Sequence, residues 1–459
     1  MHVTNTTAAP VASTALTGYA LRIAITAALA GFIFGFDTVV ISGANLPIKN
    51  LWHTSPLFHG FFIMSMALWG TVVGALFGGL PTEKWGRKKV LFWVGLLFTI
   101  SALGTALAPD PYSFSFFRFL GGLGIGVSSV VAPTYISEVS TPANRGRLVG
   151  MYQFNIVFGI LIAFLSNYFL QGISGADDWR WMLGVMAVPA IIYTVMVLAV
   201  PESPRWLLVR QNNRTAAAAV MQKLGIAQAA DEMTATQNST QEATNGELFQ
   251  PRYKKMIGLA FAIAFFNQLS GINFILYYAP EILERAGLAA KDSLFNSIAI
   301  GGTNLLFTFV GLYLIDRLGR RTLMLVGSIG YIISLGMVAY CFKTSAPPTL
   351  LLTSLVVYIA AHAVGQGAVI WVFISEIFPN RVRALGQSFG ASVHWVFAAI
   401  ITLITPLFLD AQEGWLKGAP WIIFAFFAGM MGVQLLWVLF QMPETKGVSL
   451  EALEQRLSQ

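Results

Sequence analysis

The sequence predicts an all-α membrane protein in which twelve transmembrane helices form two pseudo-symmetric six-helix bundles. Hydrophobic residues make up 56% of the 459 positions and charged residues only 11%, whereas soluble proteins carry about 25% charged residues. Apolar stretches of about 20 residues, which is long enough to cross a bilayer, occur at twelve places. They are centred near Phe32, Thr71, Phe98, Ile125, Ile160, Ile192, Phe265, Leu306, Ile332, Ile359, Phe397 and Ala428.

An internal repeat indicates the two-bundle arrangement. Three motifs of the first half recur in the second half in the same order, 233 to 242 residues later: 78–90 with 312–324, 135–147 with 373–383, and 201–206 with 443–447. Each motif falls on the same side of the membrane in both halves, so we expect parallel halves related by an axis along the membrane normal. The chain then divides into a tail (1–18), a bundle (19–200), a linker (201–252), a second bundle (253–442) and a tail (443–459).

The basic residues predict the orientation. If both termini are cytoplasmic, 21 of the 28 Lys and Arg residues lie on the inner side and 6 on the outer side, which is the positive-inside bias. The net charge of +7 is therefore a topology signal, and we expect the lipid bilayer and no nucleic acid as a partner. The polar first 18 residues show no cleavage signature, so the first helix is expected to be an uncleaved anchor in an inner (plasma) membrane.

The linker and the cysteine content say less. A helix is predicted at 214–225, followed by a polar stretch that ends near Glu247. The linker is either a flexible connection or a short cytoplasmic helical bundle that latches the two halves together. The single cysteine, Cys341, excludes an internal disulfide.

The first helix carries an aspartate, Asp37, within an apolar run from about Ile23 to Ile41. A carboxylate at that depth costs roughly 2.5–3.5 kcal/mol, so it needs a cation, a water-filled path or both. Arg118 is embedded in another apolar run, and the helix directions place both residues in the outer half of the membrane. We expect the two side chains to pair and Asp37 to bind and release the coupling proton, because arginine contact and desolvation shift a carboxyl group in opposite directions. The alternative is a purely structural ion pair.

The repeated loops combine glycine, acid and arginine. Glycine permits a tight bend, and arginine can bind a carboxylate through two hydrogen bonds. We expect these charges to pair at the cytoplasmic helix ends and to act as a gate, although plain positive-inside charge is the alternative. The candidate gating residues are Glu83, Arg87, Glu138, Arg145, Arg147, Glu202, Arg205, Asp316, Arg320, Glu376, Arg381, Arg383 and Glu444.

Taken together, the motifs resemble the sugar porters of the major facilitator superfamily. The resemblance is carried by GFDTVVISG, EKWGRKK, RFLGGLGIG, PESPRWL, QLSGIN with YYAPEI, DRLGRR, WVFISEIFP and PETKG, and it spans about Gly31 to Gly447. It implies alternating access, with the two bundles rocking around one central sugar site. Proton-coupled members carry Asp at the position of Asp37, whereas mammalian facilitators carry Asn. One bacterial proton symporter of the family also has an acid in the sixth helix, where this sequence has Met186, so we expect one carboxylate to suffice.

Amide side chains in the apolar helices are candidates for binding sugar hydroxyls, because an amide both donates and accepts hydrogen bonds. In the seventh helix Gln268 and Asn273 face one cavity only if the helix is broken near residues 270–271. The candidate sugar-binding residues are Gln153, Asn267, Gln268, Asn273, Tyr277, Asn304, Trp371, His394 and Trp395. The resemblance assigns six of these to sugar, namely Gln153, Gln268, Asn273, Asn304, Trp371 and Trp395. The alternative is that the amides only join helices.

Three positions depart from the family pattern. Asn267 replaces a glutamine, His394 stands where an amide is common, and Ala368 replaces a proline of the tenth helix. These departures bear on which sugar is bound, and the sequence leaves hexose and pentose open.

The expected function is transport of a monosaccharide together with protons by a monomer that needs no cofactor and no metal. An uncoupled facilitator is the nearest alternative, and a non-transporting sugar receptor is a more distant one. An enzyme is disfavoured, because neither helix-embedded histidine, His362 or His394, has an acidic residue three or four positions later.

Overall fold

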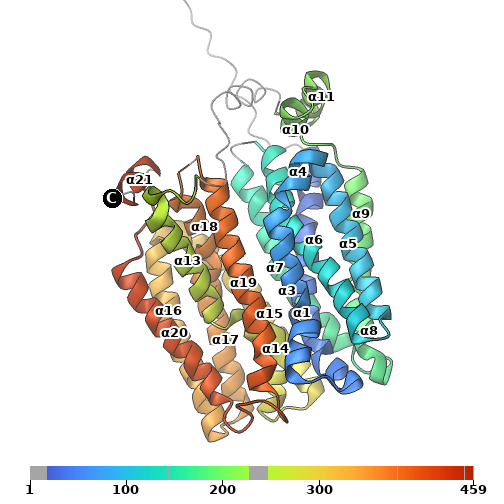
Figure 1. The fold of residues 1–459 in the computed structure, drawn as a ribbon, viewed down its shortest axis with the longest axis vertical. Coiled ribbons are helices and arrows are strands. Elements are labelled where there is room, and N and C mark those ends of the chain that lie inside the picture. The colour runs from blue at the N-terminus through green and yellow to red at the C-terminus, as the bar shows by residue number, and fades with distance from the viewer. Residues whose placement is uncertain (1–17, 142–143, 227–246, 380, 449, 458–459) are drawn as a thin grey trace, which may run out of the picture.

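The computed structural model describes residues 18–141, 144–226, 247–379, 381–448 and 450–457 (Figure 1). The N-terminal tail and the polar centre of the linker lie outside these ranges. All regular structure in the described residues is helical. Eleven helices are long and apolar enough to cross a membrane, and a twelfth span is formed by a helix pair bent by 44°. The predicted all-α fold and its twelve spans are confirmed.

The spans follow the predicted order. In the first half they are α1 (Gly18–Trp52), the bent span α2 (Pro56–Phe58), η1 (His59–Met64) and α3 (Met66–Phe77), then α5 (Arg87–Leu107), α6 (Pro111–Glu138), α7 (Arg145–Leu170), and η2 (Gly175–Asp177) with α8 (Asp178–Gly184) and α9 (Ala187–Leu198). In the second half they are η3 (Pro251–Tyr253) with α13 (Lys254–Leu269) and α14 (Ile272–Arg285), then α15 (Ala290–Leu318), α16 (Arg320–Thr344), α17 (Pro348–Val364) with α18 (Gln366–Ile377), α19 (Arg383–Leu409) and α20 (Trp421–Phe440). In the residues that the structure describes, four short helices lie outside the spans: α4 (Gly79–Trp85), α10 (Pro204–Val209), α11 (Arg214–Leu224) and α21 (Leu450–Leu457).

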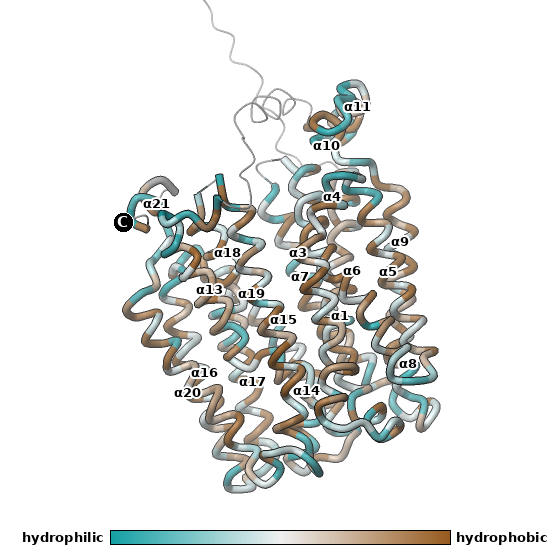
Figure 2. Tube along the Cα trace, in the orientation of Figure 1, coloured by the Kyte–Doolittle hydropathy of each residue, from teal (hydrophilic) through white to brown (hydrophobic). Residues whose placement is uncertain are grey.

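The two halves stand side by side in Figure 1, and most helices pack within their own half. The first half is joined by α1 against α7 and by α3 and α5 against α6, and the second by α16 against α20 and by α13 against α19. Contacts between the halves run through α7 and α15, α3 and α19, and α1 and α14. Figure 2 shows hydrophobic colouring along the middle of the helices and hydrophilic colouring at both ends, as a membrane-spanning bundle requires.

The two ends of the molecule differ. We call the end formed by α4, α10, α11 and α21 the motif end, because the repeated motifs lie there (Figure 1). The opposite end, formed by α8 and by residues 53–55 and 410–420, is called the distal end. The linker helix predicted at 214–225 is present as α11, and α10 and α11 lie beside the first half.

Candidate functional site

Asp37 and Arg118 form a buried ion pair between α1 and α6. Arg118 Nη1 donates to Asp37 Oδ1 at 2.6 Å, and Arg118 Nη2 lies 3.4 Å from the backbone carbonyl oxygen of Asp37. Neither residue is more than 1% exposed. Within the described ranges, Asp37 Oδ2 and Arg118 Nε have no hydrogen-bond partner, so one acceptor and one donor of the pair stay uncommitted. The contact expected from the sequence is present.

The seventh span is broken where the amide argument required a break. Helix α13 ends at Leu269 and α14 begins at Ile272, and Gly271 between them has φ of +83°. Only glycine adopts this conformation without strain. Two contacts hold the break in place: the Ser270 hydroxyl donates to the Asn267 carbonyl oxygen at 2.6 Å, and the Tyr358 hydroxyl donates to the Ser270 carbonyl oxygen at 2.9 Å.

Beside this break, Gln268 and His394 bring α13 and α19 together. Gln268 Nε2 lies 3.1 Å and 3.2 Å from the two ring nitrogens of His394, and 3.3 Å from Asn267 Oδ1. Gln268 is fully buried and Asn273 is 8% exposed. Their Oε1 and Nδ2 atoms have no partner among the described residues. An unpaired acceptor and an unpaired donor, both buried, are what a ligand with many hydroxyls can satisfy.

Aromatic rings surround the histidine. The Trp371 ring lies 5.0 Å and the Trp395 ring 4.8 Å from the His394 ring, centroid to centroid. The Trp395 ring also lies 5.6 Å from the Phe34 ring of α1, so this group reaches the first half. Trp371 is 37% exposed, and a partly exposed ring can offer an apolar face to a sugar.

The remaining sugar-binding candidates lie on other helices. Asn304 is buried on α15, and Tyr277 is buried on α14, close enough to Asp37 and Arg118 to interact with them electrostatically. Gln153 is half-buried on α7, the helix that packs against α15. In the described part of the chain, neither Gln153 nor Asn304 makes a side-chain hydrogen bond to the group around Gln268.

At the motif end of the first half, Arg87 connects three segments. Its guanidinium donates to both carboxylate oxygens of Glu138 at 3.0 Å, to Glu83 at 2.6 Å and to the Thr82 carbonyl oxygen at 3.1 Å. Arg210, in the linker, binds the other oxygen of Glu83 at 3.0 Å. The cluster therefore ties α4, α5, α6 and the linker together within one half.

The second half repeats this arrangement. Arg320 donates to the two carboxylate oxygens of Glu376 at 2.8 and 3.1 Å, lies 3.4 Å from Asp316, and donates to the Ile315 carbonyl oxygen at 3.1 Å. Thr445 adds a hydroxyl donor to Glu376 at 2.6 Å. The repeat predicted from the motifs is thus present in three dimensions.

A glutamate caps the helix start in each cluster. Glu202 Oε1 accepts from the backbone N–H groups of Arg87 and Lys88 at 2.9 and 3.1 Å, and Glu444 accepts from those of Arg320 and Arg321 at 2.9 and 3.0 Å. Burial dominates at Glu202 and raises its pKa. Burial also opposes ionisation of Glu444, but four backbone N–H donors outweigh it and lower the pKa of that carboxyl group.

The other candidate gating residues are less connected. Arg145, Arg147 and Arg205 are exposed and form no ion pair within the described ranges. Arg381 binds Glu247 at 2.5 Å, and Arg383 lies 3.4 Å from the carbonyl oxygen of Phe378. All the described ion pairs at the motif end therefore stay within one half or join it to the adjoining linker.

The distal end holds a polar cluster that the sequence analysis missed. Lys49 of α1 forms an ion pair with Asp410 at the end of α19, and Asn45 Nδ2 donates to Glu281 Oε2 of α14 at 2.7 Å. Both contacts join the two halves. The sequence does contain a signal for this cluster, because Glu281 is an acidic residue in the same predicted helix as the amides, one residue after Pro280. In the sequence analysis, Glu281 served only as part of a family motif.

Comparisons with known proteins agree with this geometry. The family model described as "Sugar (and other) transporter" matches residues 23–457. The chain belongs to the sugar transporter family. It is a multi-pass plasma-membrane protein with the major facilitator fold, and a secondary transporter of sugar rather than an enzyme.

Individual relatives cover almost the whole chain. The arabinose-proton symporter of Bacillus subtilis is 34% identical over 97% of both proteins, and the D-xylose-proton symporter of Escherichia coli K12 is 31% identical over 95% of both. A "Glucose transport protein" of Synechocystis is 33% identical over 97% of this chain and 99% of the relative. Among solved structures, the inward-open conformation of the E. coli xylose transporter XylE superposes with a TM-score of 0.83 at 30% identity, covering 95% of this chain and 100% of that one.

Proposed function

We propose that the protein is a monosaccharide–proton symporter of the bacterial inner membrane and that it functions as a monomer. The observation that carries the proposal is the buried Asp37–Arg118 pair, with its 2.6 Å contact and its two uncommitted atoms. A structural pair would be expected to satisfy its buried polar atoms. An aspartate that trades its arginine contact for a proton needs a free oxygen. The named activities of the arabinose and xylose relatives support the same reading.

The proposed sugar site lies around the broken seventh span. Gln268, Asn273 and His394 supply donors and acceptors, and Trp371 supplies an apolar face. Asn267 and Trp395 contact this group, while Tyr277, Gln153 and Asn304 lie on α14, α7 and α15. Because buried polar groups left unpaired cost about 1–3 kcal/mol each, an amide site of this kind favours a ligand with several hydroxyl groups over an apolar one.

Tyr277 offers a link between the sugar site and the proton site. It lies four residues after Asn273 and interacts electrostatically with Asp37 and Arg118. A sugar that rearranges α14 therefore changes the surroundings of the carboxylate. Each proton that crosses a 100 mV membrane potential supplies about 2.3 kcal/mol, which is enough for a sugar gradient of about 50-fold.

We propose further that the motif end is cytoplasmic and that both termini lie there, because 21 of the 28 Lys and Arg residues then face the cytoplasm. The moving units would be residues 19–200 and 253–442, connected by 201–252. In this arrangement the Arg87 and Arg320 clusters keep each bundle rigid at its cytoplasmic end, and they serve the gate as two matched braces.

Uptake into proteoliposomes tests the proposal. An imposed gradient with acid outside should drive labelled xylose, arabinose or glucose above its equilibrium level, and adding the sugar should alkalinise a weakly buffered medium. An uncoupled facilitator would equilibrate the sugar without changing the pH of the medium, and a receptor would transport none.

A further inference from the structure

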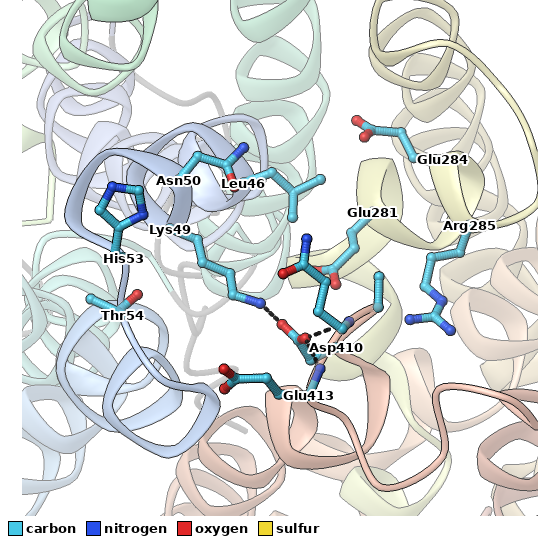
Figure 3. Close-up of a pocket in the computed structure, with 12 residues that line it drawn as sticks. Leu46, Lys49, Asn50, His53, Thr54, Glu281, Glu284, Arg285, Asp410 and Glu413 are labelled. Carbon is cyan, nitrogen blue, oxygen red and sulfur yellow. Dashed lines mark hydrogen bonds and ion pairs between the residues drawn. The ribbon is translucent and has the colours of Figure 1, made fainter.

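The distal end contains a cavity of about 450 Å³ at the junction of the two halves (Figure 3). Its lining includes Lys49, Glu281, Glu284, Arg285, Asp410 and Glu413. Figure 3 shows Lys49 reaching from α1 toward Asp410, with Glu281 beside them on α14. This part of the molecule holds charged groups from both bundles, and none of them has a role in the sugar site described above.

Behind the cavity, four buried side chains form a continuous hydrogen-bond chain. Thr54 Oγ1 lies 2.8 Å from His59 Nδ1, His59 Nε2 lies 2.7 Å from Asn45 Oδ1, and Asn45 Nδ2 lies 2.7 Å from Glu281 Oε2. These residues are between 1% and 9% exposed. The first three belong to the first half and Glu281 to the second, so the chain crosses between the bundles.

The direction in which hydrogen bonds are donated along these four side chains depends on whether Glu281 is protonated. With Glu281 ionised, every donor points toward it: the threonine hydroxyl to Nδ1, the Nε2–H group to the asparagine oxygen, and the asparagine amide to the carboxylate. With Glu281 protonated, its O–H group can donate to Asn45 instead, provided the amide turns over and His59 exchanges its tautomer. Each member then still has a partner, so the chain accommodates both protonation states without leaving a buried group unsatisfied.

Burial of the Glu281 side chain, which is only 9% exposed, disfavours the charged carboxylate when the end is closed. Lys49 and Arg285 bring two positive charges, against the carboxylates of Glu281, Glu284, Asp410 and Glu413. Lys49 is already paired with Asp410, and Arg285 donates to backbone carbonyl oxygens of Leu409 and Lys417.

The neighbouring elements add little further charge. His53 also lines the cavity, and Tyr278 lies near Glu281 on the same helix. No charged residue of α13, α15 or α17 lines the cavity in the described ranges. Closing this end therefore takes the Glu281 carboxyl group out of water without adding a new cation beside it, which favours its neutral form.

We propose that Glu281 is a second proton-binding residue of the transport cycle, and that the Thr54–His59–Asn45–Glu281 chain makes closure of the distal end depend on its protonation. The inference rests on the proposed proton symport, with the distal end extracellular. A proton taken from the outside would favour closure over the loaded sugar, and loss of that proton would favour reopening. Glu281 thereby serves the role for which the sixth helix, with Met186, has no acid.

Thiol accessibility of the full-length protein in proteoliposomes tests this directly. In a Cys341→Ser background, Leu46→Cys places a reporter in the cavity, and Ser174→Cys places an exposed reference at the same end, which corrects for titration of the thiol itself. The labelling rate of the cavity thiol with an impermeant maleimide, divided by that of the reference thiol, should fall several-fold between pH 8 and pH 5.5. Glu281→Gln should hold the ratio low at both pH values. Glu284→Gln removes a carboxylate from the same cavity but leaves the hydrogen-bond chain intact, so it should still show the several-fold fall.

A second variant guards against a folding defect. Asn45→Ala keeps the carboxylate but removes the link between His59 and Glu281, so the fall in the ratio between pH 8 and pH 5.5 should become much smaller. A ratio independent of pH in the parent protein, or an unchanged titration in Glu281→Gln, would overturn the inference. Labelling needs neither sugar nor a pH gradient, so a protein that titrates here yet fails to accumulate sugar would refute proton symport and leave the proton-dependent closure standing.

Discussion

Replacing Arg87 with alanine tests the reasoning about the motif end most sharply, because the chain contains a matched control in Arg320. Arg87 and Glu138 are 5% and 6% exposed, and Arg87 provides both hydrogen bonds that Glu138 receives within the described ranges. Arg87→Ala leaves a buried carboxylate without a countercharge, which costs about 3–5 kcal/mol. In Arg320→Ala the carboxylate side chain of Glu376 is 27% exposed and keeps the Thr445 hydroxyl, so the loss should be nearer 1–3 kcal/mol.

Chemical denaturation in mixed micelles measures both losses as changes in the free energy of unfolding. The difference of about 2 kcal/mol corresponds to about a 30-fold change in the folded-to-unfolded ratio. Arg87→Ala combined with Glu138→Gln should recover most of the loss, because the uncompensated charge is gone. Equal losses in the two single variants, or no recovery in the double variant, would refute the assignment of Arg87 as a buried brace.

Three further predictions concern separate features. Glu202→Gln and Glu444→Gln should show opposite pH trends in thermal midpoint relative to the parent. The lowered pKa of Glu444 gives stability that is present above about pH 4.3 and lost as the pH falls, whereas the raised pKa of Glu202 gives stability that is present at acid pH and lost as the pH rises. Parallel trends in the two variants would contradict the two cap environments. Trp371→Ala and Gln268→Ala should weaken sugar binding by about tenfold or more, measured by calorimetry, while proton release from the sugar-free protein stays as in the parent; unchanged sugar affinity would remove them from the site. Gly271→Ala should lower the free energy of unfolding by about 1–3 kcal/mol, because φ is +83° and the new Cβ would meet the Phe427 ring. The control Gly258→Ala, where nothing lies within 4 Å of the new Cβ, should leave the free energy of unfolding nearly unchanged. Equal effects of the two variants would show that the break does not depend on glycine.

Much of the architecture was predictable because a bilayer imposes strict limits on sequence. The need for about 20 apolar residues per span gives the helices, and the cost of a buried charge made Asp37 and Arg118 obvious partners although they are 81 positions apart. The break at Gly271 was predicted for a geometric reason, since two amides five residues apart cannot otherwise share a face. The repeated motifs predicted that Glu138 and Glu376 pair with arginines, and the structure shows that the partners are Arg87 and Arg320.

The distal cluster was harder to predict, for physical reasons. Lys49, His59 and Asp410 lie near helix ends, where polar residues are expected and attract no notice. Asn45 and Glu281 are 236 positions apart, and no motif repeat relates them. The twin glutamate caps were identified as charges, but backbone N–H groups carry no sequence signature, so their partners could not be named. Only packing of the two bundles shows which of these groups meet.

Sugar transport by Asp37→Asn in proteoliposomes with an imposed pH gradient tests the proposed proton coupling most directly. We expect this variant to exchange labelled for unlabelled sugar between equal pools, because the hydroxyl-binding residues are intact, while uphill accumulation falls from about 50-fold to none. Full accumulation by the variant would show that the buried carboxylate carries no proton and would contradict the proposed coupling.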